Sequence, residues 1–192
     1  MELKIEPSRT ALVVIDLQKG IVRIPAGPRS PAEVVARAAR MATAMRAARG
    51  TVVFVRVTPS PDGRDALNPL TDIPATAAVG ARPPDWSELV PELKPEISDI
   101  VITKRQWGAF YGTELDLQLR RRGVDTIILC GISTNVGVES TARDAFERGY
   151  QQVFVEDAMT AREAEDHRHT VSTLFPRIGR IRSTEDVLAA LK

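Results

Sequence analysis

Residues 126–143 read TIILCGISTNVGVESTAR, and this stretch decides the fold. Its first five residues are a continuous apolar run rich in β-branched side chains, which is typical of a parallel strand buried on both faces. The residues that follow favour a helix that Thr134 or Asn135 caps and that ends at Gly149. The stretch therefore predicts a strand, a tight turn and a helix.

The turn between that strand and that helix is a candidate binding site. A helix that starts at the carboxyl end of a strand gathers several unpaired backbone N–H groups, which can bind an anion or stabilise an oxyanion. Gly137 lies in the first helical turn, where glycine costs roughly 1 kcal/mol relative to alanine. Either the chemistry of the turn requires this glycine or another backbone segment packs closely against it, and the residues alone leave both explanations open.

The rest of the chain alternates strand and helix patterns. Further strands are expected at 11–15, 52–57, 100–102, 153–157 and 176–182, and helices at 30–45, 113–122, 162–175 and from 183 onward. The first of these helices begins with a serine, a proline and a glutamate spaced as a capping box. This order predicts an α/β protein with a three-layer α/β/α architecture, in which helices cover a doubly wound, mostly parallel six-stranded sheet. A chain of 192 residues is most simply one domain, 1–192.

Residues 58–99 interrupt this alternation and hold eight of the thirteen prolines. A connection of this length is usually functional or an arm that reaches a partner. Residues 85–90 are expected to form a short helical piece, and Trp86 either lines the pocket or anchors the loop by packing.

The composition argues against several classes of partner. The 26 basic and 25 acidic residues give a net charge of +1, which provides no electrostatic footprint for nucleic acid or an anionic membrane. The first residues are charged, and no apolar run approaches the ~20 residues of a membrane span. We therefore expect a cytoplasmic protein that acts on a small molecule.

Cysteine and histidine offer no metal site. Cys130 is the only cysteine and ends the predicted buried strand, so we expect an inert core thiol. His167 and His169 lie two apart on a predicted helix, where they point to different faces and cannot hold one metal together. We expect both to be surface or partly buried side chains, and we expect no cofactor.

Two charged residues directly follow predicted strands. Asp16 comes after five apolar residues, and Lys104 comes shortly after the strand at 100–102. The carboxyl ends of parallel strands are the usual ligand edge of such a sheet. Taken alone, Asp16 is as well explained by a turn, and Lys104 by a structural ion pair. Gln18 is placed to face the same cleft, and an aromatic wall would come from Trp107, Phe110 and Tyr111.

Three segments together resemble the isochorismatase-like hydrolases of the cysteine hydrolase superfamily. Residues 131–145 resemble the signature turn of that family, 11–18 its first strand with the catalytic aspartate, and 102–110 its lysine segment. Most of the family has a nucleophilic cysteine at the position of Gly137. The YecD-like branch shares the glycine and is the most similar branch.

This resemblance implies a hydrolase whose catalytic residues are Asp16, Lys104 and Gly137. The family's amide hydrolases use the aspartate to deprotonate the cysteine, a route that is closed here. Members with glycine include the true isochorismatases, in which the aspartate protonates a vinyl ether, so we expect vinyl-ether-type hydrolysis by Asp16 as general acid or base. The alternatives are a degenerate small-molecule-binding protein and an amide hydrolase without a cysteine. A neighbouring lysine lowers the pKa of an aspartate, so burial or the substrate must outweigh Lys104 for acid catalysis at neutral pH.

The resemblance also implies the remaining parts of the site. The Ile132–Ser133 peptide would be cis and would turn the Ser133 N–H toward the substrate together with that of Gly137. Asn135 joins Gln18 and the aromatic residues as an expected substrate contact. The lysine segment differs from that of true isochorismatases at Arg105 to Gly108, so the substrate stays open. A homo-oligomer, dimer or tetramer, is expected by analogy, with residues 58–99 as a candidate arm.

Overall fold

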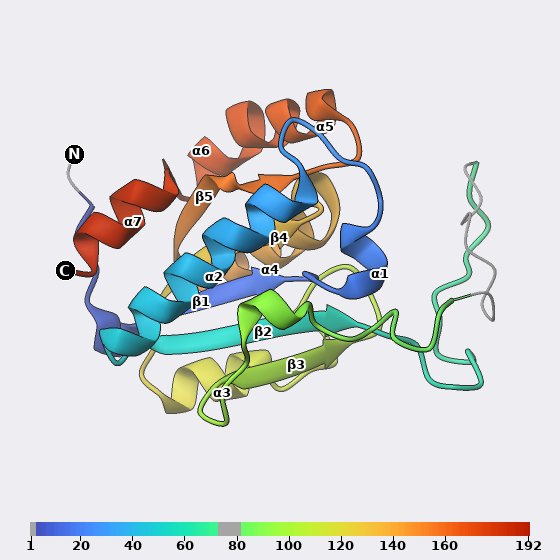
Figure 1. The fold of residues 1–192 in the computed structure, drawn as a ribbon, viewed down its shortest axis with the longest axis horizontal. Helices are drawn as coiled ribbons and strands as arrows, with labels where there is room; N and C mark the ends of the chain where they lie inside the picture. The colour runs from blue at the N-terminus through green and yellow to red at the C-terminus, as the bar shows by residue number, and fades with distance from the viewer. Residues whose placement is uncertain (1–2, 73–81) are drawn as a thin grey trace.

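The computed structural model describes residues 3–72 and 82–192, which form a sheet between two layers of helices (Figure 1). Within these residues the sheet has six strands in the order β3-β2-β1-β4-β5-β6, and each neighbouring pair is parallel. The strands are β1 (Thr10–Ile15), β2 (Thr51–Val57), β3 (Ile100–Lys104), β4 (Thr126–Ile132), β5 (Gln151–Thr160) and β6 (Arg180–Arg182). The predicted doubly wound α/β fold is confirmed.

Helices cover both faces of the sheet. One face packs against α2 (Pro31–Ala47) and α7 (Thr184–Ala190), and the other against α3 (Leu115–Arg121), α4 (Glu139–Glu147) and α6 (Phe175–Ile178). Shorter elements connect them, namely α1 (Lys19–Val22), α5 (Ala164–His169), the 3-10 turns η1 (Pro7–Arg9) and η2 (Pro91–Leu93), and the π-helical turns η3 (Thr134–Val138) and η4 (Thr170–Leu174). No helix in the described ranges is long and apolar enough to cross a membrane.

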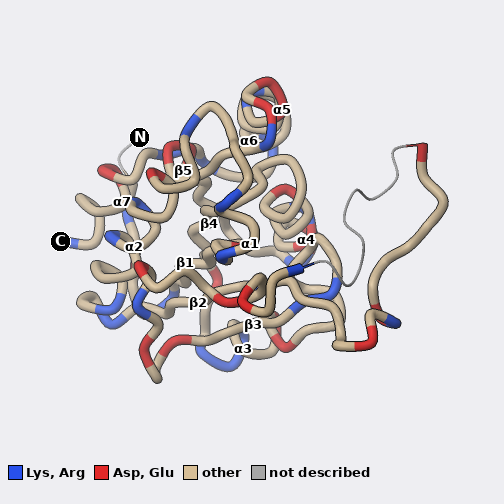
Figure 2. Tube along the Cα trace, turned by 45° about the vertical axis from the view of Figure 1, so that its right-hand side comes forward, with Lys and Arg blue, Asp and Glu red and all other residues tan. Residues whose placement is uncertain are grey.

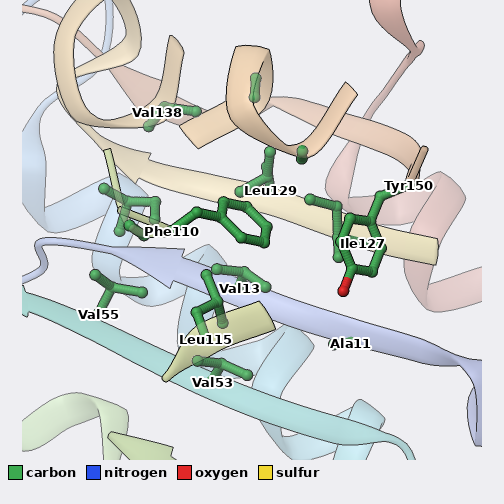
Figure 3. Packing of buried hydrophobic residues seen from close by; sticks show 14 of the residues in the cluster. Ala11, Val13, Val53, Val55, Phe110, Leu115, Ile127, Leu129, Val138 and Tyr150 are labelled. Carbon is green, nitrogen blue, oxygen red and sulfur yellow. The ribbon is translucent and has the colours of Figure 1, made fainter. Parts of the chain in front are cut away.

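The sheet is apolar on both faces because each of the four central strands, β2, β1, β4 and β5, contributes to two cores. In β1, the side chains of Val13 and Ile15 enter one core, whereas those of Leu12 and Val14 enter the other. Figure 3 shows the first core, where Val13 lies among residues of β2, β4 and the loop after β3. Burial on both faces explains why the strands are continuous apolar runs instead of alternating ones.

Helix α2 follows the sequence prediction closely. Ser30 and Glu33 form a reciprocal capping box at its start. Its buried residues form the stripe that helical spacing predicts: Val34, Val35, Ala38, Met41, Ala42 and Met45. The surface carries basic and acidic residues interspersed along the described chain (Figure 2).

Two local predictions differ from the structure. Residues 85–90 form turns instead of a helix, and the one short helical turn nearby is η2. The pattern at 176–182 divides into the end of α6 and the short strand β6. The segment 58–99, which was predicted as a candidate arm, includes residues 73–81, which lie outside the described residues.

Trp86 anchors its loop by packing. Its indole lies against Gly20, where a Cβ atom would approach to 2.0 Å, and the Arg82 guanidinium lies 4.1 Å from the ring centroid. It does not line the cavity described below. Of the two roles considered for Trp86, the structure supports the packing role.

The strand order places a crevice at the carboxyl ends of β1 and β4. The chain winds outward from β1 through β2 to β3 and then returns to β4 on the other side of β1. Ligands bind at such a reversal in open α/β sheets. At Gly131, at the end of β4, φ is +122° and a Cβ atom would lie 2.1 Å from the Ile15 carbonyl oxygen. The crevice therefore depends on close backbone contact between β1 and β4.

Substituting Gly131 tests this contact. Gly131→Ala is expected to lower the free energy of unfolding by more than about 4 kcal/mol, because the methyl group collides with rigid backbone. Chemical denaturation followed by circular dichroism measures the change. The control is Gly149→Ala, where φ is also positive but no atom lies within 4 Å, and where we expect a loss of about 1–2 kcal/mol. Equal losses for both variants would contradict the argument.

Candidate active site

A buried ion pair joins the carboxyl ends of β1 and β3. Lys104 ends β3, and its Nζ donates to Asp16 Oδ2 over 2.7 Å. The two side chains are only 1% and 7% exposed. Asp16 has φ of 53° and donates its backbone N–H to the Val55 carbonyl oxygen of β2. Asp16 adopts this left-handed conformation where the chain leaves β1. Aspartate tolerates such a conformation better than most residues do.

All the donors of Lys104 are in use. Besides Asp16, its ammonium group donates to the carbonyl oxygens of Trp107 (2.7 Å) and Gln106 (3.2 Å). An ammonium group has three N–H donors, so these contacts saturate it. Lys104 therefore acts on Asp16 through its charge and its hydrogen bond, and it has no free donor for another ligand.

Asp16 has the properties of a proton carrier. Burial raises its pKa to about 6, although the charge and the hydrogen bond of Lys104 act in the opposite direction. Its second oxygen, Oδ1, is buried without a hydrogen-bond partner within the described part of the chain. Burial and Lys104 thus have opposite effects on the pKa of Asp16, and the effect of burial is the larger. The pKa therefore lies near the range that acid–base catalysis needs.

The turn after β4 brings Gly137 against this pair. The Ile132–Ser133 peptide is cis, as the resemblance implied. Gly137 lies in η3, and a Cβ atom on it would be 3.0 Å from Asp16 Oδ2 and 3.5 Å from Lys104 Nζ. The atoms nearest to that position belong to the side chains of Asp16, Ile15 and Lys104, so the explanation by another backbone segment packing against Gly137 is not supported. A chemical reason for this glycine stays a prediction.

The predicted helix cap was wrong. Ser133 is the residue that precedes the helical segment, and no side chain caps it. Thr134 Oγ1 instead bonds to His167 Nδ1 (2.9 Å), and Asn135 Oδ1 accepts from Ser133 Oγ (3.0 Å). Both side chains therefore bond to neighbouring side chains and neither caps the helical segment.

A cavity of about 270 Å³ opens beside the pair. Its charged lining residues are Asp16, Lys104 and Arg162. Ser133 and Gly137 line it from the turn after β4, and Trp107 lines it from the loop after β3. Most of the remaining wall is apolar and consists of Ile21, Ile24, Pro25, Ala26, Val57, Ile132 and Val136.

Four of the expected substrate contacts do not line this cavity. Gln18 is buried and forms two hydrogen bonds with the backbone of Val57, donating to its carbonyl oxygen (2.9 Å) and accepting from its N–H (2.8 Å). Phe110 lies in the core beside Tyr150 (Figure 3). Tyr111 is 75% exposed, and Asn135 bonds to Ser133. The predicted aromatic wall is thus reduced to Trp107.

The sequence prediction missed Arg162 and the wall at 21–26. Arg162 was missed because β5 was expected to end at 157, whereas it continues to Thr160 and so carries Arg162 to the ligand edge. The apolar residues of 21–26 have no regular periodicity that could reveal their face.

The buried side chains outside the cavity have separate roles. His167 is buried, contrary to the expected surface or partly buried position, whereas His169 is exposed. Burial, helped by the charge of Arg29, lowers the pKa of His167 to about 4, so it is neutral at pH 7. Burial raises the pKa of the Cys130 thiol, which keeps it protonated in the core.

The two hydrogen bonds between Gln18 and the Val57 backbone give a stability prediction. Gln18→Leu is expected to lower the free energy of unfolding by about 2–4 kcal/mol, because the N–H and carbonyl groups of Val57 lose their partners inside the protein. Thermal and denaturant unfolding measure this loss. The control Gln151→Leu changes an exposed glutamine and should remain within about 0.5 kcal/mol of wild type. A Gln18→Leu variant as stable as wild type would contradict this structural role and would favour the predicted contact between Gln18 and the substrate.

Comparisons with known proteins agree with this geometry. The Isochorismatase domain family model matches residues 10–186. The isochorismatase family protein YecD of Escherichia coli O157:H7 is 51% identical over 98% of this chain and 100% of its own length. Ureidoacrylate amidohydrolase RutB of Variovorax paradoxus is 34% identical over 81% of this chain and 70% of its own. The structure of an isochorismatase family protein from Burkholderia thailandensis superposes with a TM-score of 0.93 at 45% identity, covering 98% of this chain and 97% of that one. The chain therefore belongs to the isochorismatase family of hydrolases.

Proposed function

We propose that this hydrolase cleaves a small vinyl ether, or a similarly activated molecule, with Asp16 as general acid and then general base. The observation that carries the proposal is the buried Asp16–Lys104 pair facing a glycine where a nucleophile would stand. This arrangement supports proton transfer to the substrate without a covalent bond to the protein.

The reaction would proceed in two proton transfers. Protonated Asp16 gives its proton to the terminal vinyl carbon, and the ether-bearing carbon becomes an oxocarbenium ion. Water adds to that carbon and loses a proton to the Asp16 carboxylate. The resulting hemiketal then breaks its bond to the leaving alcohol, giving a carbonyl compound and the alcohol. Lys104 stabilises the carboxylate that exists between the two transfers.

The position of Gly137 supports a reaction without a protein nucleophile. A Cβ atom there would meet Asp16 Oδ2 at 3.0 Å and Ile15 Cγ2 at 3.1 Å, so a side chain would crowd the acid. Glycine leaves that space to the substrate or to water. Ser133 and Gly137 both line the cavity, and their backbone N–H groups would orient a substrate oxygen.

Amide hydrolysis is the second candidate, because the relative RutB is named as an amidohydrolase. Without a thiol, water would have to attack the carbonyl carbon directly, with Asp16 as the base and the backbone N–H groups holding the oxyanion. That reaction requires ionised Asp16, whereas vinyl-ether protonation requires the acid form. The two candidates therefore predict opposite pH dependence.

The pH dependence of kcat/KM separates them. For an enol ether substrate, kcat/KM is expected to fall as pH rises through about 6, because the pKa of Asp16 is about 6 and the reactive form is protonated. The measurement is initial rates across pH with a panel of alkyl vinyl ethers. Asp16→Asn should lose about 10²–10⁴ in rate. Turnover of small amides that rises through this pH range, without turnover of the vinyl ethers, would identify Asp16 as a base and favour amide hydrolysis.

Restoring a thiol tests the remaining possibility of a degenerate binding protein. Under our proposal, Gly137→Cys loses vinyl-ether turnover by at least about tenfold, because the side chain occupies space beside Asp16. Turnover is compared for vinyl ethers and small amides in wild type, Gly137→Cys and the double variant with Asp16→Asn. An inert wild type whose Gly137→Cys variant hydrolyses amides would show that the glycine had abolished an amidase.

A further inference from the structure

The hydroxyl group of Thr141, on α4, joins the two loops that meet the ion pair. Its Oγ1 donates to the Gly137 carbonyl oxygen (2.7 Å) and accepts from the Ala109 N–H (3.1 Å). Gly137 belongs to the turn after β4, and Ala109 to the loop after β3. We propose that Thr141 is a positioning residue, which holds both loops against the Asp16–Lys104 pair without touching the substrate. This inference rests on the proposed function in taking Asp16 as the proton carrier.

A second hydrogen bond distinguishes Thr141 from an ordinary helical threonine. Threonines in helices often donate to the carbonyl oxygen four residues earlier, which satisfies their own hydroxyl. Thr43 is such a residue in α2, where its Oγ1 donates to the Ala39 carbonyl oxygen (3.0 Å) at an exposed position. Thr141 makes the same kind of bond to Gly137, but it is fully buried and also accepts the N–H of another segment. That second bond serves no purpose within the helix and indicates a role between loops.

The loop after β3 contacts both Lys104 and Thr141. Two of its carbonyl oxygens, including that of Trp107 at 2.7 Å, accept hydrogen bonds from the Lys104 ammonium group. Ala109 follows shortly after and is fully buried, so its N–H would be costly to leave without a partner. Thr141 provides that partner, and the next residue, Phe110, packs in the core (Figure 3). The bond to Thr141 therefore fixes the loop close to the carbonyl oxygens that hold the lysine.

The turn after β4 is tied to the same hydroxyl. Gly137 faces the ion pair, since a Cβ atom on it would lie 3.0 Å from Asp16 Oδ2 and 3.5 Å from Lys104 Nζ. Thr141 holds the carbonyl group of this glycine. The contacts thus form a closed ring from Asp16 through Lys104, the loop after β3 and Thr141 to Gly137. In such a ring each contact limits the movement of the others, so the loss of one hydroxyl would loosen both loops. Within the described part of the chain, Thr141 does not line the cavity itself.

Loosening these loops is expected to lower the pKa of Asp16. Burial raises this pKa, so water that enters between the loops would bring it down. Lys104 lowers the same pKa, and its ammonium group would act more strongly on Asp16 once the Trp107 carbonyl oxygen no longer shares it. Both changes have the same direction. Lys104 and Arg162, the cations that line the cavity with Asp16, stay in place when Thr141 is changed, so a shift would report the position of the loops.

An NMR titration of Asp16 tests this role without any turnover. The carboxyl carbon shifts of aspartate-labelled protein are followed against pH, and the variant Asp16→Asn identifies the signal. Thr141→Val keeps nearly the same shape and removes the hydroxyl, so the midpoint of the titration is expected to fall by at least about half a pH unit from its wild-type value. Thr141→Ser keeps the hydroxyl and removes a buried methyl group, so the midpoint should stay at its wild-type value while the unfolding temperature falls.

The matched control is Thr43→Val, which removes the same local hydroxyl bond from α2 and should leave the Asp16 midpoint unchanged. If Thr141→Val does not fold, Thr141→Ala replaces it, because the smaller side chain places no methyl group against the two polar partners. An unchanged or raised midpoint without the hydroxyl, an equal shift in Thr43→Val, or a shift in Thr141→Ser as large as that in Thr141→Val would each overturn the assignment. The titration needs no substrate, so this inference and the proposed vinyl-ether hydrolysis can fail separately.

Discussion

The buried ion pair of Asp16 and Lys104 is the constraint on which the site depends. Two charges at 1% and 7% exposure are costly to remove from water, and such a pair is tolerated only when its geometry is good and its remaining donors are satisfied. The carbonyl oxygens of Gln106 and Trp107 satisfy the lysine, which also shapes the loop after β3. The free oxygen of Asp16 is the part of the pair that this arrangement leaves for chemistry.

The topology of the sheet explains why these groups meet. Asp16 follows β1, Lys104 ends β3, and Gly137 follows β4, so their positions lie far apart in sequence and close together at one edge. The glycines at 131 and 137 make this closeness possible, the first for backbone against backbone and the second for backbone against the ion pair. A side chain at Gly131 would have to displace backbone that the sheet holds rigidly, whereas one at Gly137 would crowd the side chain of Asp16.

The cavity combines one proton carrier, one saturated lysine and one unsaturated arginine within apolar walls. In the proposed reaction, Asp16 would transfer protons and Lys104 would stabilise its charged form.

The sequence by itself determined the strands, the capping box of α2, and the location of Asp16 and Lys104 at strand ends, because these follow from local apolar patterns and from the resemblance. Only the tertiary structure decided where Gln18 points, since its partner Val57 is 39 residues away. The same holds for Phe110, which packs into the core beside Tyr150, and for Arg162, which the longer β5 carries to the cavity. The sequence likewise did not decide the pKa of Asp16. Burial raises this pKa and Lys104 lowers it, and the extent of burial is set only in the folded chain.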